Sequence, residues 1–241
     1  MRRLIWITLF VAILWCAWWV IFGWGLKSAL DTWFEDRRSV GWQADYTTLE
    51  LSGFPTRVQA DLTDIVLAGT GSGLLINLPD LSIGAPTHWP GDVTLFLPSD
   101  PISFVSHEGR STLQVLDGVA DLQLHPGPSL ELERISASAA VWSLQTGKRT
   151  VLSAQDTTLT MDQSKASANT YTFVATTNKL SPGDAARTAL RLPTDWPVTS
   201  ETFTVSGDIS FDKPWDISAL EQARPQPRRI NLELAEAVWS D

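Results

Sequence analysis

Histidines and acidic pairs are the side chains of this sequence whose types suit metal binding or acid–base chemistry. His88, His107 and His125 lie in three separate turn-like stretches, and none has metal-ligand spacing to another histidine or to the single cysteine. Glu131 and Glu133 share one face of a strand, where two carboxylates can do acid–base work. Alternating acids are also typical of a solvated strand face. We therefore interpret the histidines as loop residues and the glutamates as surface residues.

Two motifs of nucleotide-binding proteins and hydrolases are incomplete in this chain. The stretch GTGSGLL, residues 69–75, has closely spaced glycines but lacks the following helix that a phosphate-cradling loop needs. Ser72 is not the nucleophile of a G-x-S-x-G motif, because Thr70 stands two residues before it. The sequence therefore predicts a non-enzymatic protein with no catalytic residues, no metal and no cofactor. An unrecognised hydrolase is the enzymatic alternative.

The N-terminus predicts a membrane anchor. Residues 4–22 are uncharged and apolar, and as a helix they would span about 28 Å, close to one hydrocarbon core. A cleaved signal peptide is the alternative, but bulky tryptophans occupy the region where its small cleavage-site residues would stand. Arg2 and Arg3 favour a cytoplasmic N-terminus. We expect residues 1–22 to form a cytoplasmic tip and a single-pass, uncleaved inner-membrane signal anchor, with the rest of the chain in the periplasm.

The exit end of the apolar run is rich in tryptophan, and such rings prefer the headgroup region of a membrane. These residues are Trp15, Trp18, Trp19 and Trp24. Cys16 follows the bulky Trp15 rather than a small residue, so it is predicted to be a buried apolar residue and not a lipidated one. Residues 23–38 then have helical periodicity and predict an amphipathic stalk helix. Its apolar stripe would pack on the following domain or lie in the membrane interface.

Net charge excludes one class of partner. The chain has a formal net charge of −9, and removing the two positive charges before Gly23 leaves −11 on residues 23–241. An acidic domain repels phosphate backbones, so we expect no nucleic acid partner. Acidity of this size is also an ordinary means of staying soluble.

Residues 39–241 predict one β-rich periplasmic domain, because apolar and polar residues alternate along most of it. The strongest local signal is Asp117-Gly118 between two alternating runs, which predicts a two-residue hairpin. Pairing outward from that turn places Leu113 opposite Leu122 and Val115 opposite Ala120. A change of phase between Leu132 and Ile135 predicts a β-bulge.

The overall prediction is a mainly β protein with a curved antiparallel sheet of about ten to twelve strands and two short helices packed on it. One helix would begin with Ser181 as N-cap and Pro182 at the first helical position. The other would run roughly from Ile217 to Ala223 and stop at Pro225.

The stretch LSGFPTRVQA, residues 51–60, interrupts the strand pattern near the start of the domain. Gly53 permits a tight turn and Pro55 cannot donate a ladder hydrogen bond. We expect Phe54 to plug the end of the core and Arg57 to pair with Glu50 or Asp61. The alternative role for Arg57 is ligand binding. We interpret Gly53, Phe54, Pro55 and Arg57 as a structural motif.

The order of these features resembles an uncharacterised bacterial family, the domain of unknown function 2125 family. The resemblance rests on the anchor, the tryptophan-rich stalk, Gly-Phe-Pro-x-Arg after the first strand, Phe211-Asp212 before Pro214, Arg224-Pro225 and the strand from Ile230. The family often has an aromatic residue where this chain has Thr56, and its members continue well beyond a tryptophan like Trp239. The stop at Asp241 fits a short member or a truncated reading frame, and it predicts an unpaired sheet edge. The family implies no activity.

A looser, architectural resemblance is to AsmA-like envelope proteins, which have one anchor and a curved β-sheet with an apolar groove. It implies a cell-envelope protein that holds or passes a lipid or other apolar ligand. The groove would be lined by Phe203, Val205, Phe211 and Trp142. The same aromatic residues would otherwise fill a sealed core, and the protein would then bind another envelope protein through a sheet edge or its stalk helix.

Overall fold

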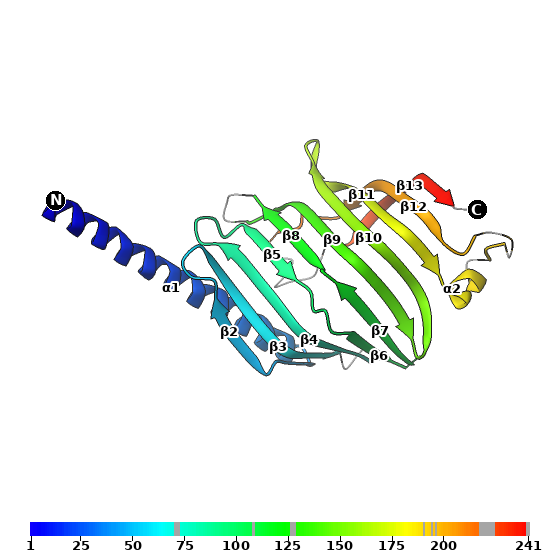
Figure 1. Ribbon diagram of the computed structural model, residues 1–241, viewed down its shortest axis with the longest axis horizontal. Coiled ribbons are helices and arrows are strands. Elements are labelled where there is room, and N and C mark those ends of the chain that lie inside the picture. Colours follow the sequence, from blue (N-terminus) through cyan, green and yellow to red (C-terminus); the bar gives the residue numbers. More distant parts are fainter. Residues whose placement is uncertain are drawn as a thin grey trace.

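The computed structural model describes residues 1–69, 73–107, 109–125, 129–189, 191–193, 195, 197–216 and 225–239. It is mainly β, with one long N-terminal helix, one short helix and a 13-stranded antiparallel sheet (Figure 1). The predicted fold class is thereby confirmed, with one strand more than the expected range. The predicted helix around Ile217–Ala223 lies outside the described residues.

Helix α1 (Arg2–Ser39) contains both the predicted anchor and the predicted stalk without a break. Its 38 residues correspond to a rod of about 57 Å. Residues 1–18 are all exposed, whereas Gly23 and Phe34 are buried against the sheet. Among the described residues, α1 is the one helix long and apolar enough to cross a membrane, and no residue of its most apolar part is buried in the protein. This fits a single-pass anchor.

The strands follow one another along the chain, with helix α2 (Asp184–Ala189) between β11 and β12. Their bounds are β1 (Trp42–Asp45), β2 (Thr48–Ser52), β3 (Arg57–Gly69), β4 (Leu74–Pro86), β5 (Asp92–Phe96), β6 (Ile102–Ser106), β7 (Gly109–Leu116), β8 (Val119–Leu124), β9 (Leu132–Thr146), β10 (Arg149–Ser164), β11 (Ser167–Pro182), β12 (Ser200–Phe211) and β13 (Pro227–Trp239). The main path across the sheet is β1-β3-β4-β5-β8-β9-β10-β11-β12-β13. β2 pairs with β3, β6 pairs with β4 and β7, and β7 also pairs with β9.

The register gives the sheet one apolar and one polar face. A single row of directly paired residues crosses nine strands from β3 to β13, and every member is apolar: Ala60, Ile83, Leu95, Ala120, Ala137, Leu159, Ala175, Val205 and Leu234. The adjacent row on the opposite face is mostly polar: Gln59, Gly84, Thr94, Asp121, Ser136, Thr160, Val174, Ser206 and Glu233. We call these the inner and outer faces. Alternation along each strand produces both.

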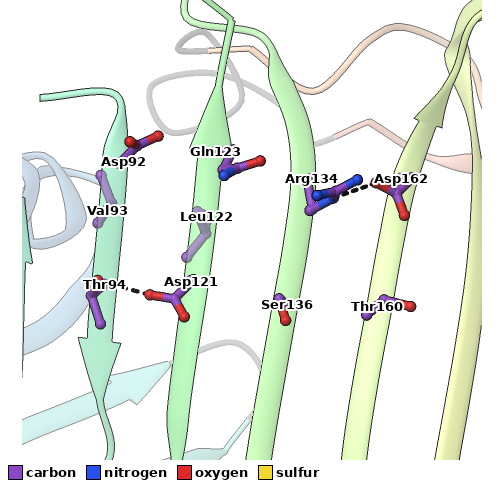
Figure 2. A pocket seen from close by; sticks show the side chains of 10 residues that line it. All are labelled: Asp92, Val93, Thr94, Asp121, Leu122, Gln123, Arg134, Ser136, Thr160 and Asp162. Carbon is purple, nitrogen blue, oxygen red and sulfur yellow. Dashed lines mark hydrogen bonds and ion pairs between the residues drawn. The ribbon is translucent and has the colours of Figure 1, made fainter. Parts of the chain in front are cut away.

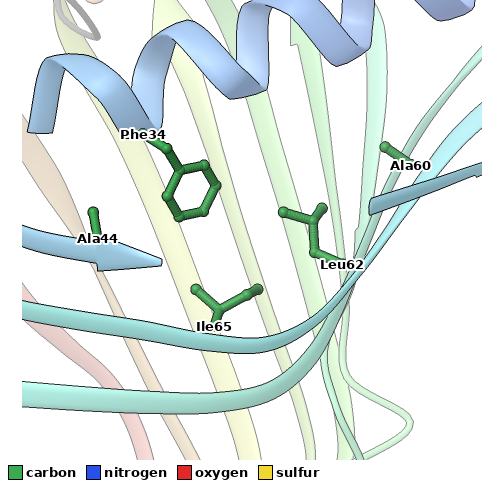
Figure 3. Close-up of a cluster of buried hydrophobic side chains, with 5 residues drawn as sticks. All are labelled: Phe34, Ala44, Ala60, Leu62 and Ile65. Carbon is green, nitrogen blue, oxygen red and sulfur yellow. The ribbon is translucent and has the colours of Figure 1, made fainter. Parts of the chain in front are cut away.

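Helix α1 covers the inner face at one end of the sheet. Phe34 points from the helix toward Leu62 and Ile65 of β3 (Figure 3). These three side chains are 2–4% exposed. Phe34 also makes an edge-to-face contact with Tyr46, whose ring centroid lies 4.8 Å away. The stalk stripe therefore packs on the domain, which is one of the two alternatives left open by the sequence.

The predicted hairpin at Asp117 and Gly118 is wrong. β7 and β8 do not pair with each other; both pair with β9, one after the other along its length. Asp117 has a positive φ of 52°, as the first position of a type I′ turn would. Here the positive φ lies between β7 and β8, which form two segments of one long, interrupted strand along β9. The amide of Leu97 donates to the carbonyl of Gly118 at this interruption.

Two further local predictions have opposite outcomes. The bulge is confirmed: Gln123 pairs with Arg134 and Leu124 with Leu132, which leaves one extra residue on β9. The predicted N-cap is wrong, because β11 continues through Pro182 and helix α2 (Asp184–Ala189) begins after Gly183. The amide of Gly183 donates to the carbonyl of Val151 on β10, so strand pairing extends past the expected cap.

Candidate ligand-binding face

The inner face beyond α1 is an apolar surface that the described helices leave largely uncovered. Helix α1 contacts β1, β2 and β3, and α2 contacts β10 and β11. Within the described ranges, no helix contacts β5, β8, β9, β12 or β13. Leu159, in the middle of the inner row, is 36% exposed, and Leu234 at its end is 60% exposed. We call the inner-face residues of β5 and of β7 to β13 the open face.

A hollow of about 330 Å³ lies in the middle of the open face. Its lining is almost wholly apolar and includes Leu113, Val115, Ala137, Trp142 and Leu159. The volume is at the lower end of the range typical of small-molecule sites. A hollow of this composition suits a hydrocarbon chain and offers little to a charged ligand.

Polar groups in this region satisfy one another. The indole of Trp142 donates to the Thr157 hydroxyl at 2.7 Å, and that hydroxyl lies 2.6 Å from the hydroxyl of Thr177. Thr177 in turn donates to the carbonyl of Gln155. This series of hydrogen bonds fixes the Trp142 ring, and the apolar part of the ring lines the hollow.

The other predicted groove residues lie on the same face at two different places. Phe203 pairs with Thr177 and Val205 with Ala175, so both lie on β12, two strands beyond β10, the last strand that lines the hollow. Phe211 instead belongs to an aromatic cluster, with ring centroids 5.9 Å from Tyr171 and 5.6 Å from Trp215. The structure thus brings Trp142, Phe203 and Val205 onto the open face and places Phe211 in the cluster at one end of it.

Tyr171 anchors this aromatic cluster. Its side chain is wholly buried, and its hydroxyl donates to the carbonyl of Leu132 at 2.9 Å. Burial raises the pKa of Tyr171 above its ordinary value, because the phenolate would lose its hydration. Tyr171 therefore stays a neutral donor, and the cluster closes the end of the open face where β9 begins.

A second apolar hollow, of about 260 Å³, lies beneath α1. It is lined by Leu30, Trp33 and Phe34 of the helix and by leucines and isoleucines of β3 and β4. Because the helix already occupies this part of the inner face, ligand would have to displace it. We regard this hollow as imperfect packing between α1 and the sheet.

The outer face carries a polar hollow of about 460 Å³ across β5, β8, β9 and β10 (Figure 2). Three of the charged groups that line it have partners on a neighbouring strand: Arg134 pairs with Asp162, and Asp121 accepts from the hydroxyl of Thr94 at 2.8 Å. Such pairs stabilise neighbouring strands. In the part of the chain that the structure describes, no group of three or more His, Cys, Asp or Glu side chains could hold a metal ion.

The turn at residues 53–57 does not close the core. Phe54 is 56% exposed and makes an edge-to-face contact with Trp19 of α1, with ring centroids 5.5 Å apart. The expectation that it plugs the core is wrong, because its packing partner is the anchor helix. The Phe54–Pro55 peptide bond is cis.

The predicted partners of Arg57 are also wrong. Asp61 accepts hydrogen bonds from Ser52, Gln59 and Ser82 instead. Burial raises the pKa of the Asp61 carboxyl, but these three hydrogen bonds outweigh it and hold the pKa below its ordinary value. Asp61 therefore joins β2, β3 and β4 on the outer face, opposite α1.

Three indole groups of α1 bind the backbone of the domain. Trp15, Trp18 and Trp19 donate to the carbonyls of Pro55, Thr87 and Arg57, at 2.9, 2.8 and 2.6 Å respectively. The sequence placed these tryptophans at the membrane surface and gave no sign of these partners. The one available signal was their spacing of three and four residues, which places the three tryptophans on one face of the helix.

The family model described as an uncharacterized protein conserved in bacteria (DUF2125) matches residues 19–241. The chain belongs to this family. The DUF2125 match begins at Trp19, the residue that contacts both Phe54 and Arg57, and it includes the whole open face. No curated protein and no solved structure matches the chain. The architectural likeness to AsmA-like envelope proteins has no support from these comparisons and stays a prediction.

Proposed function

We propose that this DUF2125 protein is a non-enzymatic, membrane-anchored protein of the bacterial cell envelope that holds the acyl chain of a phospholipid on its open face. The observation that carries the proposal is the uncovered apolar hollow around Trp142, which continues into the inner row of β10 to β13. Exposed apolar surface of this extent on a water-soluble domain is typical of a binding site.

The geometry also favours a chain-like ligand. Strands β9, β10 and β11 have 15 or 16 residues, which corresponds to about 50 Å along the strand. An acyl chain could lie along such strands, and the polar outer face would remain in water. The anchor would keep the domain beside a source of phospholipid, with the N-terminus in the cytoplasm and the sheet in the periplasm.

A photo-cross-linking experiment on the full chain tests the proposal. The crosslinking amino acid benzoylphenylalanine replaces Leu159 on the inner face or, as a matched control, Val174 on the outer face. The two side chains are similarly exposed, at 36% and 41%, and occupy neighbouring strands. Cells are grown with radioactive phosphate, irradiated, and the protein is purified under denaturing conditions.

We expect a radioactive phospholipid adduct at Leu159 and little or none at Val174. Equal labelling at both positions would show nonspecific contact with lipid, and absence of label at Leu159 would overturn the proposal. Neither result depends on an activity assay.

A second candidate function is supported by strand β13. Among the described strands β13 pairs with β12 alone, and it exposes Ile230, Leu232 and Leu234 by 54–69%. An edge of this kind can accept a strand from another envelope protein. In the same experiment, a crosslinker at Leu232 would then give a protein adduct, whereas the lipid-holding function predicts a lipid adduct at Leu159.

A further inference from the structure

Contacts between α1 and the domain begin well inside the apolar run of the helix. The run covers residues 4–22, and the first indole hydrogen bond to the domain is at Trp15. Residues 4–14 therefore stand clear of the sheet and would cover about 16 Å of a hydrocarbon core about 30 Å thick. Residues 15–22 supply the rest of the apolar length while they lie beside the sheet.

Two segments of the domain share this level of the helix. They are the turn at residues 53–57 and the connection at residues 87–91, and Trp15, Trp18 and Trp19 bind them through Pro55, Thr87 and Arg57. We call these two segments the foot. Gly91 belongs to the foot and accepts from the amide of Leu124, so the foot lies at the end of the sheet where β8 finishes and β9 begins.

The chemistry of the foot suits a lipid surface. Backbone carbonyls that leave water must find donors, and three of them here are paired with indole N–H groups. Neither segment contains Asp or Glu, although residues 23–241 carry a net charge of −11. Phe54 is 56% exposed beside Trp19, and the second segment contains Trp89; aromatic residues of this kind are typical of membrane interfaces.

We propose that the foot is inserted into the outer part of the bilayer that α1 crosses, beside Trp15, Trp18 and Trp19, so that the sheet lies directly against the membrane. The anchor then spans the hydrocarbon core together with the foot, and Phe54 contacts acyl chains. The aromatic cluster of Tyr171, Phe211 and Trp215 lies at the same end of the sheet, because Leu132 accepts from Tyr171 and pairs with Leu124. The open face thus begins beside the membrane. This inference rests on the membrane crossing of α1, but not on a bound lipid.

The test is a depth measurement by spin labelling of the full chain in phospholipid vesicles. Cys16 is replaced by Ala, and a single cysteine carries a nitroxide at Phe10, Phe54 or Lys148. Phe10 lies in the free part of α1 and reports on the anchor itself. Lys148 lies in the exposed turn between β9 and β10, at the far end of the sheet from the foot, and is the control in water.

Collision rates with oxygen, which concentrates in lipid, and with a water-soluble nickel chelate give the depth of each label. We expect the oxygen-to-nickel ratio to fall in the order Phe10, Phe54, Lys148, with Phe54 several-fold above Lys148. A Phe54 ratio equal to that of Lys148, with Phe10 deep, would overturn the foot and leave the anchor and the lipid proposal standing. A water-exposed Phe10 label would overturn the anchor and the foot together. Circular dichroism confirms that each labelled variant is folded.

Discussion

The inner face has a covered half, under α1, and an open half, and the two halves differ in burial more than in sequence. Leu62 and Ile65 in the covered half are 2% and 3% exposed, whereas Leu159 and Leu234 in the open half are 36% and 60% exposed. Both halves belong to strands with the same alternation of apolar and polar residues. Alternation therefore specifies which side of a strand is apolar, and a separate element decides whether that side is sealed.

The polar faces of the two halves also differ. Behind the covered half, one carboxylate, Asp61, receives three hydrogen bonds from residues on β2, β3 and β4. Behind the open half, the pairs are exposed and join two strands at a time, as Arg134 and Asp162 do. Exposed pairs contribute little stability. We infer that stability is concentrated near α1.

The largest expected effect compares two phenylalanines. Phe34→Ala should lower the free energy of unfolding by about 3–5 kcal/mol, because it leaves a cavity between α1 and the sheet. Phe203→Ala, on the open face, should cost no more than about half of this, since part of its surface is already in contact with solvent. Urea titration of the full chain in detergent, followed by circular dichroism, measures both. Equal losses would mean that the open half is packed as tightly as the covered half.

Removal of the Asp61 carboxylate should have the next largest effect. Asp61→Ala leaves three donors without their acceptor and should cost about 1–3 kcal/mol at neutral pH. The folded-state pKa lies below the ordinary value of 3.8. The charged carboxylate therefore contributes stability above that value, and the contribution is lost as the pH falls through the folded-state pKa.

The pH dependence is measured against Asp61→Asn, which keeps the size of the side chain without its charge. The difference in unfolding free energy between the natural protein and this variant should shrink as the pH falls below about 4. A difference that stays constant from about pH 7 to about pH 3 would show that the charge of Asp61 does not stabilise the covered half.

Trp142→Phe should have a smaller effect. It removes the 2.7 Å hydrogen bond to Thr157, which we expect to cost about 0.5–1.5 kcal/mol, while the apolar wall of the hollow remains. The same urea titration measures the loss, and the hydroxyl contact between Thr157 and Thr177 is the part of the network that should survive. A loss as large as that of Phe34→Ala would place Trp142 in a sealed core.

The smallest effect is expected at the sheet edge. Leu232→Ser replaces a side chain that is 69% exposed and should change the unfolding free energy by no more than about 0.5 kcal/mol. Light scattering of the same samples reports the oligomeric state. A stability loss well above this value, or a change from a larger to a smaller assembly, would show that β13 is covered in solution.

The sequence predicted those features that depend on local pattern. The apolar run of residues 4–22, the alternation of the strands and the bulge near Leu132 each follow from residue spacing, and each is present. Asp117-Gly118 shows the limit of local pattern. A hairpin turn and an interrupted strand both accept a positive φ at Asp117. The choice depends on β9, whose residues that pair with β7 and β8 lie 15 or more positions after Asp117.

The errors around residues 53–57 have the same physical origin. Phe54 was expected in the core because large apolar residues are usually buried by the domain that contains them. Its neighbour is Trp19, 35 positions earlier in the anchor. Arg57 was expected beside Glu50 or Asp61, but Asp61 accepts hydrogen bonds from Ser52, Gln59 and Ser82 instead. Spacing within one segment carries no information on such long-range competition.

The unbroken course of α1 has a mechanical consequence. From Arg2 to Ser39 the helix has no hinge, and from Trp15 to Phe34 it is joined to the sheet. A domain on a flexible linker explores a volume that grows with linker length. This sheet, in contrast, would rotate together with its helix as one rigid body. A tilt of about 20°, ordinary for a membrane helix, would move the far end of a strand about 50 Å long by about 17 Å. Changes in bilayer thickness would therefore be converted into lateral displacement at the distant end of the domain.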